Sequence, residues 1–303
     1  MSDLMQIFDR TTVRRHRDRA AARLGDYDFL FRESASRLAD RLEDVARDFP
    51  LVADLGCHGG ELADAIQGRR GVETVVRADL SPAMARRAGG LAIAADEEFL
   101  PFAEGAFDAI LTNLSLHWVN DLPGALIQIR RALKPDGLFL GAMLGGETLY
   151  ELRQCLTQAE VQVEGGLSPR VSPFTDSRDL GALLQRAGFA LPVVDSDIIT
   201  VRYENPMRLL DDLRGMGESN AVAERRKGFT RRETLLTALE RYVAEHRDPE
   251  DGRVPASFQV LYMHAWAPHE SQQKPLRPGS AAHRLADALK AEEFKVDGKP
   301  RRN

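Results

Sequence analysis

The sequence is poor in cysteine and has no long apolar segment. Only two cysteines occur, Cys57 and Cys155, so neither a disulfide framework nor a thiolate metal site is expected. The longest apolar run, residues 138–144, has seven residues and is too short to span a membrane. The N-terminal residues lack the apolar core of a secretion signal. These absences predict a protein of a reducing compartment, placed in the cytoplasm and without stable membrane insertion.

An excess of positive charge is also absent. The chain has 41 basic and 46 acidic residues, for a formal net charge of −5. This balance argues against a nucleic-acid partner, because such proteins must neutralise phosphate. With 303 residues, 43% of them hydrophobic, the chain is long enough for one large core domain with additions.

Composition and pattern divide the chain into three parts. Residues 1–49 are expected to form an N-terminal helical lid, from two helices over 4–24 and 27–49. Residues 50–270 are expected to form the main domain, with a cofactor half at 50–145 and a substrate-facing half at 146–270. The polar residues 271–303 are expected to be a mobile tail with one short helix near 281–291.

Short apolar runs alternate with helical patterns after residue 50. Strands are predicted at 51–55, 72–76, 91–95, 107–112 and 138–143, and helices at 61–67, 82–88 and 123–133. This alternation is typical of parallel β-α-β units, so the fold class is α/β with a doubly wound, mostly parallel sheet. The turn Pro135-Asp136-Gly137 is expected to end a helix and begin the fifth strand.

The later half contains more helices and two further strands. Helices are predicted at 147–161, 206–214 and 230–246. A further helix is predicted to begin after Thr175 or Asp176, as its N-cap, and to end at residue 187. Strands are predicted at 195–203 and 258–266. Helical insertions are therefore expected around 145–175 and 205–250.

The first predicted strand runs into the glycine-rich turn Asp54-Leu55-Gly56-Cys57-His58-Gly59-Gly60. A strand, such a turn and a helix N-terminus present backbone N–H groups to a ligand. Asp79 follows the second strand and can accept hydrogen bonds from a ribose diol. Asp96 and Glu97 follow the third strand, where a carboxylate can bind an adenine amino group. The acid two residues before Gly56 favours a cationic amino acid group over a diphosphate.

This pattern resembles the class I S-adenosylmethionine-dependent methyltransferases, which have a Rossmann-like sheet of seven strands with the last one antiparallel. The resemblance implies S-adenosylmethionine as cofactor, with the methionine part at the loop, the ribose at the second acid and the adenine at the third. The implied cofactor-binding residues are Asp54, Gly56, Cys57, Gly60, Asp79, Leu80, Asp96, Glu97 and Asn113. His58 departs from the family, which usually has glycine there; we interpret it as a solvent-facing loop residue.

Longer sequence segments resemble one particular family within this superfamily. Four segments, at 95–102, 114–123, 146–153 and 215–220, are similar to the complex I assembly factor 5 family of mitochondrial arginine hydroxylases. That resemblance implies a respiratory complex I subunit as protein substrate, and a place at the inner face of the membrane. The malonyl-carrier-protein methyltransferases of biotin synthesis are more distantly similar and share the Phe8-Asp9-Arg10 start.

Three functions therefore stay open. They are hydroxylation of an arginine in a complex I subunit, methylation of a small acid or a carrier-bound acyl group, and a role as a non-catalytic assembly chaperone. Hydroxylation of a C–H bond needs an oxygen-activating centre. His16 and Asp18 spell H-x-D, but residues two apart on a helix point about 200° apart. No metal site is predicted.

Three side chains are candidates for catalysis: His117, Asn113 and Tyr150. His117 follows the fourth strand and can position or deprotonate a substrate; the alternative is that it bonds a loop carbonyl while Trp118 plugs the core. Asn113 can orient substrate or cap the strand, and Tyr150 can line the cleft or pack.

Charged groups outside the loop have two interpretations each. The arginines between residues 10 and 23 form either a lid over the cofactor or, by default, a solvated helix face. Asp211, Asp212 and Glu218 either contact a basic protein substrate or pair with Arg208 and Arg214.

Overall fold

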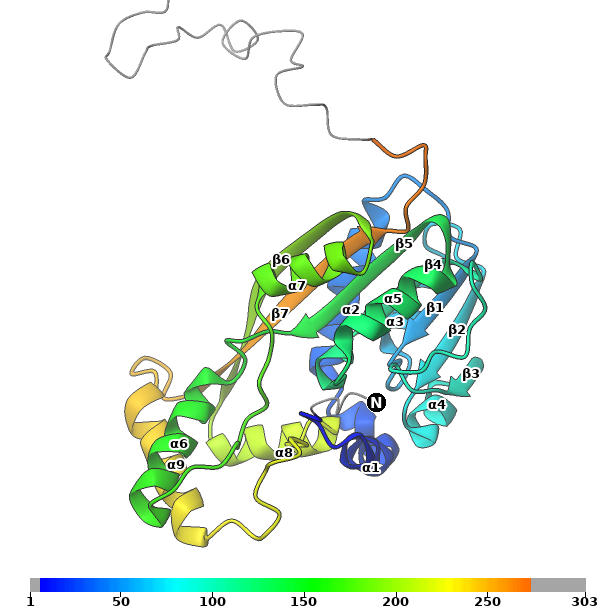
Figure 1. The fold of residues 1–303 in the computed structure, drawn as a ribbon. Helices are drawn as coiled ribbons and strands as arrows, with labels where there is room; N and C mark the ends of the chain where they lie inside the picture. The colour runs from blue at the N-terminus through cyan, green and yellow to red at the C-terminus, as the bar shows by residue number, and fades with distance from the viewer. Residues whose placement is uncertain (1–5, 274–303) are drawn as a thin grey trace, which may run out of the picture. The chain divides into compact units, whose positions relative to one another are not determined.

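One sheet organises the chain. In the computed structural model, which describes residues 6–273, seven strands are ordered β3-β2-β1-β4-β5-β7-β6 (Figure 1). Their bounds are β1 Leu51–Leu55, β2 Thr74–Asp79, β3 Leu91–Ala94, β4 Phe107–Asn113, β5 Leu133–Leu144, β6 Ala190–Tyr203 and β7 Val254–Trp266. The pairs among β1 to β5 are parallel, and β7 runs antiparallel to both its neighbours. The predicted fold class is confirmed.

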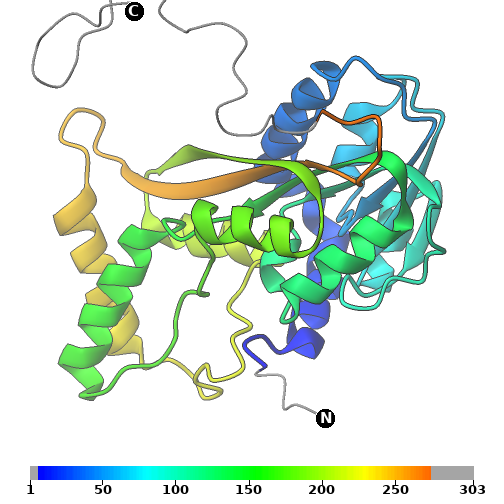
Figure 2. The ribbon, with the colours of Figure 1, turned by 45° about the horizontal axis from the view of Figure 1, so that its top comes forward.

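Helices connect these strands. They are α1 Arg10–Ala20, α2 Phe29–Glu43, α3 Glu61–Ile66, α4 Pro82–Ala88, α5 Leu122–Ala132, α6 Tyr150–Glu164, α7 Ser177–Arg186, α8 Pro206–Met216 and α9 Arg232–His246, with 3₁₀ helices η1 Ala21–Asp26 and η2 Leu116–Trp118. Both faces of the sheet are covered, because one apolar cluster joins it to α2 and α3 and a second joins it to α5 and α7. Figures 1 and 2 show α5 and α7 together on one face.

The additional helices gather near the C-terminal ends of the parallel strands. Helices α6 and α9 lie side by side in both views, and α8 packs against α1 (Figures 1 and 2). Helix α6 follows β5, and α8 and α9 lie between β6 and β7, as the two predicted insertions require. This placement puts inserted helices beside the strand ends where open α/β sheets bind ligands.

Several predicted boundaries were wrong. Helix α1 starts at Arg10 because Asp9 caps it, accepting a hydrogen bond from the Thr12 amide at 3.0 Å. Helix α2 ends at Glu43, before the predicted limit. Strand β5 starts at Leu133, so the turn Pro135-Asp136-Gly137 lies inside it, as an irregularity with Asp136 at φ 62°.

The structure does not test two of the predictions. The tail, including the helix near 281–291, lies outside the described residues from 274 onward, and the division into lid and halves stays a prediction. In the described part of the chain, no helix has the length and apolar character that crossing a membrane requires.

Candidate cofactor and acceptor site

The glycine-rich turn brings β1 against the segment that follows β4. Gly56 has φ +65°, a conformation that favours glycine. A methyl group at Gly56 would overlap the side chain of Ser115. The turn ends at Gly60, where α3 begins. The close approach of Gly56 to Ser115 therefore depends on the absence of a side chain.

His58 is not a solvent-facing residue, contrary to our interpretation. It is 1% exposed, and its ring stacks on Phe31 with centroids 4.1 Å apart. Its Nε2 lies 3.2 Å from the carbonyl oxygen of Leu114. Burial, followed by the charge of Arg17, lowers the pKa of the imidazole. His58 thus tolerates φ 47° while linking the turn to α2 and to the end of β4.

Asp79 occupies the end of β2 and is fully buried. Its carboxylate accepts hydrogen bonds from the amide of His58 at 3.1 Å and from the amide of Ser81 at 2.7 Å. The same carboxylate lies 3.4 Å from Nη1 of Arg17. Asp79 therefore holds the glycine-rich turn, the start of α4 and helix α1 together.

Arg17 reaches from α1 into the middle of the predicted cofactor crevice. Its side chain has no exposed surface. Nη1 lies 3.1 Å from Oε1 of Glu97, and Nη2 donates to Oγ of Ser115 at 2.9 Å. Arg10 from the same helix pairs with both Asp96 and Glu97. The default interpretation as a solvated helix face was wrong for Arg10 and Arg17, whereas it is correct for the exposed Arg14, Arg15, Arg19 and Arg23.

These arginines govern the charge of Glu97. Burial favours the neutral acid, but Arg17 and then Arg10 outweigh it, so the pKa of Glu97 falls to about 2. The hydroxyl of Ser115 also donates to Glu97 at 2.6 Å. Glu97 is therefore an ionised carboxylate in the interior.

Asp54 differs from the other acids of the site. It is fully buried, and no side chain within residues 6–273 donates a hydrogen bond to its carboxylate; the backbone amide of Ala63 is its nearest donor. Burial and then the charge of Glu61 raise its pKa to about 8. A buried acid without a side-chain donor fits a ligand that brings a cationic group, so the residues present fit the amino acid part of S-adenosylmethionine.

The remaining predicted cofactor residues have structural contacts. Cys57 is buried, and burial raises the pKa of its thiol well above its usual value. Leu80 packs on the apolar cluster of Phe8, Val13 and Trp118. Asn113 donates through Nδ2 to the carbonyl oxygen of Phe31 at 2.9 Å. Its Oδ1 has no partner in the described part of the chain.

The candidate catalytic residues are only partly brought together. His117 bonds Oε2 of Glu218 through Nε2 at 3.0 Å, not a loop carbonyl. The indole of Trp118 donates to the same oxygen at 2.7 Å. Tyr150 is 44% exposed, and its ring packs against His246 of α9 with centroids 6.4 Å apart. Tyr150 thus does not join His117, and the interpretation of it as a cleft residue is not supported.

A cavity of about 380 Å³ lies beside Glu218 and Trp118. Its walls come from α2, α6, α8, the loop at residues 170–174 and the ends of β5 and β7, and they are mostly apolar: Leu30, Leu144, Leu149, Leu152, Phe174, Leu213, Met216 and Phe258 are among them. Ser219, Asn220, Arg170, Arg214 and Thr230 are polar residues of its lining. We call this the apolar cavity.

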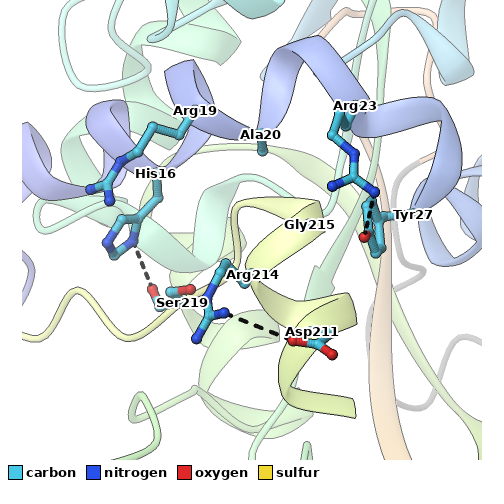
Figure 3. A pocket seen from close by; sticks show the side chains of 9 residues that line it. All are labelled: His16, Arg19, Ala20, Arg23, Tyr27, Asp211, Arg214, Gly215 and Ser219. Atoms are coloured by element: carbon cyan, nitrogen blue, oxygen red, sulfur yellow. Dashed lines mark hydrogen bonds and ion pairs between the residues drawn. The ribbon is translucent and has the colours of Figure 1, made fainter. Parts of the chain in front are cut away.

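A second cavity of about 480 Å³ lies between α1, η1 and α8 (Figure 3). Figure 3 shows the side chains of Arg19, Arg23 and Arg214 around it. His16 bonds the carbonyl oxygen of Ser219 through Nδ1 at 3.1 Å, whereas Asp18 accepts from the hydroxyl of Ser81. The two members of the H-x-D pair therefore reach different partners.

Comparisons with known proteins agree with this geometry. Residues 53–141 match the family model described as a methyltransferase domain. The chain is 47% identical to the protein named arginine-hydroxylase NDUFAF5, mitochondrial, of Danio rerio, over 97% of this chain and 92% of that one. The chain belongs to the NDUFAF5 family. It is an enzyme of the S-adenosylmethionine-dependent methyltransferase superfamily.

More distant relatives show how the family is related to other methyltransferases. The NDUFAF5-family chain is 37% identical to the malonyl-[acyl-carrier protein] O-methyltransferase of Halorhodospira halophila, over 86% of this chain and 89% of that one. It shares its fold with the solved phosphoethanolamine N-methyltransferase 2 of Haemonchus contortus, at a TM-score of 0.53 and 16% identity over 85% of this chain and 60% of that one. The mitochondrial name of the Danio rerio relative means that the predicted cytoplasmic location is not supported.

One group of potential metal ligands occurs among the described residues. Cys155, Glu245 and His246 place their ligand atoms within 4.8 Å of one another, between α6 and α9. Glu245 already accepts from Arg241 at 3.2 Å, and burial raises the pKa of Cys155 to about 11. Near neutral pH, the thiol is therefore protonated and the carboxylate is engaged, which makes the group a weak ligand set.

Sequence reasoning did not name Ser115, and it considered Arg10 and Arg17 only as part of an arginine cluster with two open interpretations. A signal for the arginines was present, because Arg10, Val13, Arg17 and Ala20 follow a three- and four-residue spacing that puts them on one face of α1. Val13 and Ala20 are buried, so Arg10 and Arg17, which share their face of the helix, point to the same side. Ser115 had no comparable signal.

Proposed function

We propose that this NDUFAF5-family enzyme binds S-adenosylmethionine in the crevice beneath α1 and modifies an arginine of a respiratory complex I subunit. The observation that carries the proposal is the 47% identity to an arginine hydroxylase over 97% of this chain, which includes the inserted helices as well as the cofactor half. The malonyl enzyme is less similar, at 37% over 86%.

The side chains of the crevice match the donors of this cofactor. Asp79 is an acceptor for ribose hydroxyls, Asp96 for the adenine amino group and Asp54 for the ammonium group. When bound, the cofactor supplies a sulfonium that activates a methyl group. Because Arg10 and Arg17 hold Asp79, Asp96 and Glu97, the cofactor and α1 compete for the same acceptors. Helix α1 is then a lid whose arginines release these acids when the cofactor binds.

His117 is the residue we propose for handling the substrate proton. Its Nε2 is fixed by Glu218, and its Nδ1 has no hydrogen-bond partner within the described ranges. An imidazole held in this way has one free nitrogen that can accept a proton. The buried indole of Trp118 beside it helps to exclude water.

Two other functions stay as alternatives. Similarity to the malonyl methyltransferase, which extends to Phe8-Asp9-Arg10, favours methyl transfer to a small acid or a carrier-bound acyl group. A non-catalytic assembly chaperone needs the fold and a partner surface but no acceptor chemistry. Hydroxylation additionally requires an oxidant and an oxygen-activating centre.

Mass spectrometry of complex I subunits separates these functions. Subunits are compared between cells that contain the gene, cells that lack it, and cells rescued with the His117→Ala variant. Loss of one oxygen's mass from an arginine on deletion supports hydroxylation, and loss of one methylene's mass supports methylation. Unmodified subunits that fail to assemble support the chaperone, provided that the variant rescues. Fractionation of the same cells tests whether the protein lies at the inner face of the membrane.

A further inference from the structure

Glu218 is a buried carboxylate with one unused oxygen. Its side chain is 6% exposed. Its Oε2 accepts hydrogen bonds from Nε2 of His117 and Nε1 of Trp118. Oε1 has no hydrogen-bond partner in the part of the chain that the structure describes. Burial opposes its ionisation, but the hydrogen bond from Nε2 of His117, together with the positive charge of Arg17, outweighs burial and lowers the pKa of Glu218. An ionised oxygen in the interior without a donor is costly and calls for a cationic partner.

The apolar cavity next to Glu218 has the dimensions and walls for one long side chain. Its volume of about 380 Å³ lies at the small end of the range for ligand pockets. Leucines, Met216 and Phe258 form walls for an aliphatic stem, while Trp118 and Phe174 add aromatic surfaces. Guanidinium groups stack on aromatic faces and pair with carboxylates more readily than ammonium groups do.

The positive charges in the wall are already compensated. Arg170 pairs with Glu160 at 2.6 Å and donates to Thr230 at 2.7 Å. Arg214 lies 3.8 Å from Asp211. Glu218 therefore sets the charge at its end of the cavity, and it would repel an acyl carboxylate.

We propose that Glu218 anchors the guanidinium group of a substrate arginine whose side chain fills the apolar cavity. This site rests on the proposed function and deepens it, because it names the residue that selects a cationic acceptor. Glu218 is a residue of the substrate site in this proposal, and Trp118 is the neighbouring aromatic wall.

Binding of small probes to the full-length protein tests this site directly. N-acetyl-L-arginine amide is compared with N-acetyl-L-citrulline amide, which has the same shape without the charge, by NMR-detected titration. One charge-assisted hydrogen bond corresponds to a preference of about tenfold to hundredfold for the arginine probe. Glu218→Gln should abolish this preference, whereas Glu218→Asp should keep part of it. Asp40→Asn, whose side chain is 73% exposed and does not line the cavity, should leave it unchanged.

Equal binding of both probes by the wild-type protein overturns the site, and this comparison does not depend on any variant folding. A preference that survives in Glu218→Gln also overturns it. Calorimetry with S-adenosylhomocysteine on the same samples separates the two proposals. Normal binding of that compound without an arginine preference overturns the Glu218 anchor but leaves the cofactor proposal. An arginine preference without binding of that compound keeps the anchor and overturns the cofactor proposal.

Discussion

Nη1 of Arg17 lies 3.4 Å from Oδ2 of Asp79, and neither side chain has exposed surface. This pair joins the N-terminal helix to the acid that we propose as the ribose acceptor. A buried ion pair is a poor source of stability by itself, because both charges lose their hydration. Because the pair lies at the crevice, we infer that it controls the access of the cofactor to Asp79.

Replacing Arg17 tests how far the crevice depends on α1. Arg17→Met leaves Asp79 and Glu97 without their shared cation, so we expect the free energy of unfolding to fall by about 3–5 kcal/mol at neutral pH. The pKa of Glu97, about 2 in the native protein, should rise in the variant. Protonation of Glu97 then relieves the penalty in acid, and the loss should be smaller at pH 4 than at pH 7.

Urea denaturation at both pH values measures this. Arg14→Met is the matched control, because Arg14 is on the same helix with its side chain 53% exposed. It should change stability by no more than about 0.5 kcal/mol. If the two variants are equally stable at pH 7, the ion pair does not hold the lid.

Asp54 gives the protein a pH-dependent weakness. Its pKa is raised from 3.8 to about 8 in the folded protein, so the folded state favours the protonated acid. This advantage is complete below pH 4 and is lost as the pH rises towards 8, at about 1.4 kcal/mol for each unit of pKa difference. Asp54→Asn removes the titration, so the variant should gain stability relative to wild type between pH 5 and pH 8.

Denaturation series at one-unit steps test this, with Asp40→Asn as the control because Asp40 is 73% exposed. A stability difference between Asp54→Asn and wild type that stays constant across the range would contradict the raised pKa.

Alanine substitutions at Gly56 and Gly105 separate the cost of an unfavourable backbone conformation from the cost of a steric overlap. Their φ angles are +65° and +64°, but only Gly56 has Ser115 where a methyl group would lie; Gly105 has open space. Gly105→Ala should cost about 1 kcal/mol from conformation alone. Gly56→Ala should cost clearly more, because Ser115 or the turn must move. Equal losses in thermal denaturation would mean that the turn adapts freely.

The sheet was predictable because strand and helix periods alternate without interruption from Leu51 to Leu144. The acids at the strand ends followed from the same pattern, since parallel strands expose their carboxyl ends at one edge. The sequence allowed a lid as one of two interpretations of the N-terminal arginines, but it did not give the contacts that close the crevice. Arg17 reaches Asp79, Glu97 and Ser115 from a distant segment, and a single sequence does not record such contacts. His58 was misjudged because its burial comes from Phe31 on α2.

Titration calorimetry with S-adenosylhomocysteine on wild type, Asp79→Asn and Arg17→Met tests the central claim, that the cofactor binds where Arg17 now holds Asp79. We expect saturable binding by wild type and about tenfold or greater weakening in Asp79→Asn, from the loss of charge-assisted hydrogen bonds. Arg17→Met should bind more tightly than wild type, because its lid no longer competes. Absence of binding by wild type, or equal affinities in all three proteins, would contradict the account.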